Sequence, residues 1–118
     1  NLILAVGSKL PLEQFQPAPP PNVHLFSRVP QLKVLEQADL MLAHGGIGTV
    51  NEALLLGVPL LVYSFGHMDQ NGNAARVAYH GLGLTGDIRR DSPAQIAQKI
   101  ERILLDPSFK TKVSRPSN

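Results

Sequence analysis

The residues best suited to binding a ligand lie between His44 and Thr49, in a short segment that also contains Gly45, Gly46 and Gly48. Glycine lacks a Cβ, so backbone amides in such a segment can approach a ligand closely. The segment joins an apolar run to an expected helix, whose N-terminus presents free N–H groups and a positive dipole. Residue types and spacing therefore predict an anion site, with phosphate as the expected ligand. A tight turn without a ligand is the alternative interpretation.

Two familiar phosphate motifs do not fit this segment. A P-loop needs a lysine directly after its last glycine, and the chain has no lysine between Lys33 and Lys99. A dinucleotide-binding fingerprint needs glycine or alanine three residues after Gly48, where this chain has Asn51. A dehydrogenase is therefore disfavoured, although Asp69 lies at roughly the distance expected of a ribose-binding acid.

Two polar residues on the expected helix extend the predicted anion site. Thr49 and Glu52 are three residues apart, so they share one helix face. If Thr49 binds a phosphate, Glu52 is placed to accept hydrogen bonds from neighbouring hydroxyls, as a ribose would present. The alternative role for Glu52 is a carboxylate favoured near a helix N-terminus by the dipole.

The composition indicates one globular domain, residues 1–118, cut from a longer protein. Hydrophobic residues make up 43% of the 118 residues and charged residues 17%, which excludes a disordered chain. No apolar run is long enough to span a membrane. The absence of cysteine excludes disulfides and thiolate metal sites, and a net charge of +2 with 5% aromatic residues argues against a nucleic-acid partner. The chain starts with Asn1 inside a strand-like run, as a fragment would.

Apolar runs alternate with helical patterns along the chain. Strands are expected at 2–6, 23–29, 40–43, 60–63 and 82–88, and the helix after Ser92 has the best-marked start, with Pro93 first and Gln95 completing a capping box. This alternation predicts an α/β fold with an open parallel sheet and helices on both faces. Ligands bind beyond the carboxyl ends of such strands, where residues 44–49 must lie.

Several charged residues have simpler expected roles. The sequence predicts that Asp87, Arg89 and Arg90 decorate an exposed turn. Lys110, Lys112 and Arg115 are expected in a solvated C-terminal tail.

A longer pattern around the glycines resembles a known family. It comprises Val29-Pro30-Gln31, the 44–49 segment, Glu52-Ala53-Leu54, Gly57-Val58-Pro59, Asp69-Gln70, Asn73-Ala74-Ala75 and Gly81-Leu82-Gly83. This pattern resembles the donor-binding signature of UDP-glycosyltransferases, in particular the bacterial macrolide- and lipid-modifying branch. The resemblance implies the GT-B fold, with two Rossmann-like domains, and identifies this chain with the C-terminal, nucleotide-sugar-binding one.

The resemblance also implies a role for individual residues. The diphosphate would lie at His44, Gly48, Thr49 and the amides around Gly46, and the ribose at Gln31 and Glu52. The backbone of Val29 would bind the edge of the base. Arg28, where plant members have a stacking tryptophan, would stack on the base. Asp69 and Gln70 would bind hydroxyls of the donor sugar.

The implied reaction is transfer of a hexose, with inversion, from a UDP- or dTDP-sugar to a small lipophilic acceptor, without metal or cofactor. The general base and the acceptor contacts belong to the family's N-terminal domain, so no catalytic residue is expected in this chain and the chain alone should be inactive. A cytoplasmic location is expected, with any membrane association left to other parts of the protein. Two alternatives remain open: a nucleotide-sugar epimerase of the same fold, and a non-catalytic subunit that docks on an acceptor-binding chain.

Overall fold

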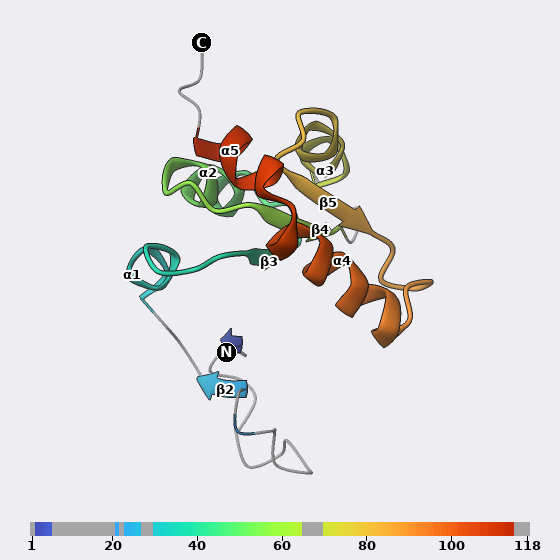
Figure 1. Ribbon diagram of the computed structural model, residues 1–118, viewed down its shortest axis with the longest axis horizontal. Helices are drawn as coiled ribbons and strands as arrows, with labels where there is room; N and C mark the ends of the chain where they lie inside the picture. The colour runs from blue at the N-terminus through green and yellow to red at the C-terminus, as the bar shows by residue number, and fades with distance from the viewer. Residues whose placement is uncertain (1, 6–20, 22, 27–29, 65–69, 115–118) are drawn as a thin grey trace. The chain divides into compact units, whose positions relative to one another are not determined.

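Strand β4 (Leu60–Tyr63) is the middle strand of a three-stranded parallel sheet (Figure 1). The computed structural model describes residues 2–5, 21, 23–26, 30–64 and 70–114. Its neighbours are β3 (Met41–Ala43) and β5 (Gly83–Gly86). All four residues of β4 are buried. Because successive side chains of a strand point to opposite faces, both faces of this sheet must be covered.

Two helical layers cover these faces. On one face, Leu60 and Val62 pack with α2 (Ile47–Leu55) and α3 (Gln70–Tyr79), whose buried residues include Val50, Ala53, Ala74 and Val77. On the other face, Leu61 and Tyr63 pack with Ile103 of α4 (Pro93–Leu105) and Phe109 of α5 (Pro107–Ser114). The predicted parallel sheet with helices on both faces is confirmed in this unit.

The chain divides into two compact units, residues 1–34 and 35–118. In the first, β1 (Leu2–Ala5) pairs in parallel with β2 (Val23–Phe26), Leu2 lying opposite Val23 and Ala5 opposite Phe26. The short helix α1 (Gln31–Leu35) follows Pro30, whose carbonyl accepts a hydrogen bond from the Val34 amide at 3.0 Å. The expectation of a single domain over residues 1–118 stays a prediction.

The start of α4 follows the capping chemistry that its sequence predicts. The Gln95 amide donates to Ser92 Oγ at 3.2 Å, and the Ser92 amide donates to Gln95 Oε1 at 2.8 Å. These reciprocal bonds satisfy two N–H groups that have no acceptor within the helix. The helix therefore begins where the sequence places it.

The expectation of a solvated C-terminal tail is wrong for residues 107–114, which form α5. Phe109 and Val113 are four residues apart, so they lie on one helix face, and both are buried. Lys110 Nζ donates to the Gly57 carbonyl at 2.5 Å. Burial of these two apolar residues holds the segment in a helix, although its lysines suggested a solvated tail. Arg115 lies outside the described residues.

A polar network holds the turn between β5 and α4. The Tyr63 hydroxyl donates to Asp91 Oδ2 at 2.8 Å, and Lys99 Nζ donates to the same oxygen at 2.6 Å. Lys99 also donates to the Thr85 carbonyl at 3.1 Å. Burial, with the Asp91 carboxylate beside it, raises the pKa of Tyr63 to about 12, and the Lys99 and Tyr63 hydrogen bonds hold the pKa of Asp91 below its usual range. Asp91 is thus fixed as a carboxylate that ties the turn to β4 and α4.

We predict that Gly83→Ala strongly destabilises the fold. A Cβ at Gly83 would fall on the carbonyl oxygen of Leu60, so β4 and β5 would have to separate. The expected loss is about 3 kcal/mol in the free energy of unfolding, measured by urea denaturation. Gly72→Ala is the matched control, because nothing lies within 4 Å of its added Cβ and alanine favours the helix. Similar midpoints for the two variants would contradict this packing.

Candidate functional site

Residues 44–46 link β3 to the start of α2, and Gly45 gives this loop its shape. Gly45 has a φ of +96°, a conformation that residues with a Cβ rarely adopt. A Cβ at this position would lie 3.0 Å from the Gln70 carbonyl oxygen and 3.2 Å from Val62 Cγ1. Gly45 is therefore required by the close packing of the loop against β4 and the first residue of α3.

Gly46 and Gly48 differ from Gly45 because both are exposed and have no atom within 4 Å of an added Cβ. Gly46 is the N-cap of α2, and as a glycine it offers no side chain to cap this helix end. The Val50 amide donates to the Gly46 carbonyl at 3.0 Å, so the amides of residues 47–49 precede the first helical hydrogen bond. A helix N-terminus with a glycine N-cap and exposed glycines is suited to an anion.

A buried asparagine holds the loop to α3. Asn73 Nδ2 donates to the Gly45 carbonyl at 2.7 Å, and the Asn73 side chain is 5% exposed. Among the residues of known burial, it is the one buried polar residue besides Tyr63. Asn73 belongs to the family pattern in the sequence but has no predicted role there; its signal is that it shares a helix face with buried Ala74 and Val77.

His44 lies at the exit of β3, where its imidazole is exposed. Its Nδ1 is 3.4 Å from the carbonyl oxygen of Tyr63. When Nδ1 carries the proton, it donates to this carbonyl. The neighbouring strand thus orients the ring of His44.

The structure brings together part of the predicted site. His44, Gly46, Gly48, Thr49 and Glu52 lie within the loop and the first two turns of α2, and the backbone of Gln70 reaches the same loop through Gly45. Thr49 and Glu52 are both half-buried.

The positions of the other predicted residues relative to this loop stay predictions. Gln31 belongs to the first compact unit, which is described by itself. Arg28, Val29 and Asp69 lie outside the described residues.

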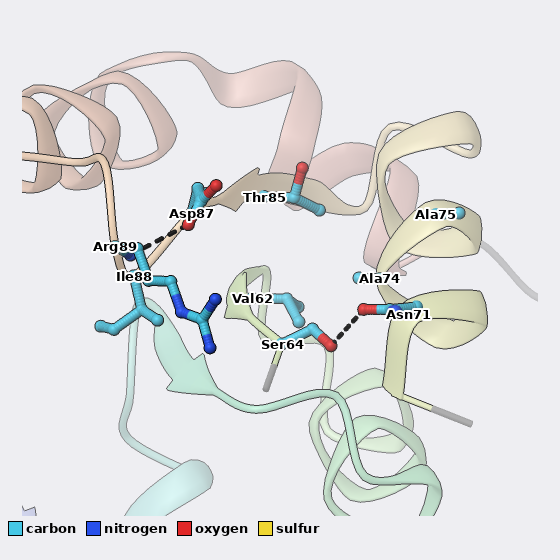
Figure 2. A pocket seen from close by; sticks show the side chains of 10 residues that line it. Val62, Ser64, Asn71, Ala74, Ala75, Thr85, Asp87, Ile88 and Arg89 are labelled. Atoms are coloured by element: carbon cyan, nitrogen blue, oxygen red, sulfur yellow. Dashed lines mark hydrogen bonds between the residues drawn. The ribbon is translucent and has the colours of Figure 1, made fainter. Parts of the chain in front are cut away.

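A pocket of about 550 Å³ opens beside this loop, at the carboxyl ends of β4 and β5 (Figure 2). Ser64 follows β4, Asn71 lies in the first turn of α3, and Asp87 and Arg89 follow β5. The predicted exposure of Asp87 and Arg89 is confirmed, but both residues line a cavity as well. This volume is in the range of small-molecule sites.

Among the described residues, no group of three or more His, Cys, Asp or Glu side chains could hold a metal ion. Within residues 30–64 and 70–114, no helix has the length and apolar character to cross a bilayer.

Comparison with known proteins places the chain among glycosyltransferases. Residues 10–118 match the family described as erythromycin biosynthesis protein CIII-like, C-terminal domain. The curated 4'-demethylrebeccamycin synthase of Lentzea aerocolonigenes is 32% identical over 114 residues, which are 97% of this chain and 26% of that protein. The solved glycotransferase of kitacinnamycin has a TM-score of 0.88 and 34% identity, over 96% of this chain and 29% of that one. Glycosyltransferase VinC, solved in complex with dTDP, has a TM-score of 0.79 and 29% identity, over 82% and 24% of the two chains.

Fold and relatives together define a Rossmann-like α/β domain of the kind that forms the C-terminal half of GT-B glycosyltransferases. The chain belongs to the erythromycin biosynthesis protein CIII-like C-terminal domain family, which confirms the resemblance to the UDP-glycosyltransferase donor domain. It spans about a quarter of the length of these relatives.

We predict that Asn73→Ala destabilises the protein by about 1–3 kcal/mol, because the Gly45 carbonyl loses a buried hydrogen bond. Asn51→Ala is the matched control, since Asn51 is an exposed asparagine in α2 and such surface changes stay within about 0.5 kcal/mol. Thermal unfolding of both variants provides the measurement. Equal stability of the two would show that the Asn73 bond does not hold the loop.

Proposed function

We propose that this chain is the donor-binding domain of a glycosyltransferase that transfers a hexose from a UDP- or dTDP-sugar to a small lipophilic acceptor, with inversion. The observation that carries the proposal is the N-terminus of α2 at the carboxyl end of β3, where the N-cap Gly46 and the first-turn Gly48 are exposed. The dTDP bound to VinC supports a nucleotide ligand of this class.

The diphosphate lies, in this proposal, against the amides of residues 47–49, with Thr49 and His44 beside it. These groups are already oriented: α2 fixes the amides, and the Tyr63 carbonyl fixes the imidazole. Glu52, one turn further along α2, accepts from ribose hydroxyls together with Gln31. Arg28 and Val29 contact the base, and Asp69 and Gln70 bind the sugar.

The reaction follows from where negative charge develops. An acceptor oxygen attacks the anomeric carbon from the face opposite the diphosphate, and the bond from that carbon to the phosphate oxygen breaks. The bonding electrons leave with the diphosphate, whose growing charge is stabilised by the α2 amides, His44 and Thr49. The proton of the acceptor hydroxyl passes to a base in the N-terminal domain. No metal is needed, because helix and side-chain donors supply the positive potential.

We predict that UDP or dTDP binds more tightly than ADP or GDP, and that EDTA does not change the affinity. Isothermal titration calorimetry with the four nucleotides provides the measurement. Strict dependence on magnesium, or equal affinity for all four nucleotides, would contradict the proposal.

We predict that Thr49→Ala weakens binding of the nucleotide by about tenfold to a hundredfold, because a hydrogen bond to a charged group contributes about 1.5–3 kcal/mol. His44→Ala has the same expected effect, and the melting temperature of both variants stays near that of the wild type. Thr49→Ser, which keeps the hydroxyl, is the matched control. Unfolding of Thr49→Ala and His44→Ala would instead make these residues structural parts of a turn.

A further inference from the structure

The pocket at the carboxyl ends of β4 and β5 offers hydrogen-bond donors. Ser64 Oγ donates to Asn71 Oδ1 at 2.6 Å, which leaves the two N–H groups of the Asn71 amide for another acceptor. Figure 2 shows the Arg89 side chain extending from the turn after β5 toward Val62 and Ser64. Among the described residues, no hydrogen bond or ion pair engages its guanidinium.

Asp87, the acidic residue of the pocket lining, forms no ion pair with the Arg89 guanidinium among the described residues. Asp87 Oδ1 accepts from the backbone amide of Arg89 at 2.9 Å, and Asp87 Oδ2 is 3.7 Å from Nε of Arg90. Both carboxylate oxygens thus have partners within the turn. Asp87 and Arg89 thus contribute one negative and one positive charge to the lining, and the guanidinium offers donors in the planar arrangement that suits a carboxylate.

The backbone that carries Arg89 is firmly held. The amides of Arg90 and Asp91 donate to the Asp87 carbonyl at 3.0 Å and 2.8 Å, and Asp91 is bound to Tyr63 and Lys99. An added Cβ at Gly86 would meet the Tyr63 ring, so the start of the turn packs directly on β4. A fixed backbone lowers the entropic cost of placing the guanidinium on a ligand.

The pocket continues the proposed donor site along the sheet edge. Asn73 bonds the loop that would hold the diphosphate, and Asn71 of the same helix lines the pocket, with Gln70 preceding both. The strand order β3-β4-β5 places the turn after β5 on the other side of β4 from that loop. The pocket therefore lies on the β5 side of the loop proposed for the diphosphate.

We propose that this pocket binds a carboxylate on the donor sugar, that of a hexuronic acid, and that Arg89 determines this specificity. The inference rests on the proposed nucleotide-sugar function and names the sugar class for it. Arg89 and the Asn71 amide bind the two carboxylate oxygens, whereas a neutral hexose leaves the guanidinium without a charged partner.

The test is calorimetric titration of the native protein with UDP, UDP-glucose and UDP-glucuronate, in wild type, Arg89→Met and Arg90→Met. We expect the wild type to bind UDP-glucuronate about tenfold more tightly than UDP-glucose, since a charge-assisted pair is gained. Arg89→Met should remove this preference and leave UDP affinity unchanged. Arg90→Met is the matched control and should keep the preference, because the Arg90 side chain pairs with Asp87.

Three results would overturn the inference. Equal wild-type affinity for the two UDP-sugars would do so, as would a preference that survives Arg89→Met or one that Arg90→Met removes to the same extent. Failure of UDP itself to bind would count against the proposed function and this inference together. UDP binding without a preference for the uronate would count against this inference alone.

Discussion

Strand β4 has no solvent-facing side, and the positions of both helical layers follow from this constraint. Leu60 and Val62 require the α2–α3 layer, and Leu61 and Tyr63 require the α4–α5 layer. Since all three strands of this sheet are parallel, the segments that leave them at their carboxyl ends meet at one edge. The candidate anion loop and the neighbouring pocket both lie at that edge.

At this edge of the sheet, residues of the same type have different roles: some hold the structure together and others face the proposed ligand. Gly45 is fixed by its positive φ and by contact with α3, whereas Gly46 and Gly48 face open space. Asn73 is buried and holds the loop, whereas exposed Asn71, two residues earlier, lines the pocket. The role of each glycine or asparagine therefore depends on its packing and hydrogen-bond contacts, and not on its residue type alone.

Local patterns in the sequence predicted much of this architecture. The apolar run at 60–63 predicted a buried strand, Ser92 and Gln95 predicted the start of α4, and the glycines predicted a helix N-terminus after β3. Contacts between distant segments were missed: Asn73 with Gly45, Tyr63 with Asp91, and Phe109 with the far face of the sheet. These depend on where the chain returns in space, which periodicity and capping signals do not encode. The roles of all the predicted donor-binding residues, Arg28, Val29 and Asp69 among them, stay predictions from the family resemblance.

We propose that the N-terminus of α2 binds the diphosphate of a nucleotide. A titration of ¹⁵N-labelled protein with UDP, followed by the backbone amide chemical shifts, tests this proposal. We expect the largest shift changes at residues 46–49, because their amides face the charged phosphates, with smaller changes at Gln70 next to the loop. Saturating UDP that leaves residues 46–49 unshifted while other amides respond would contradict it.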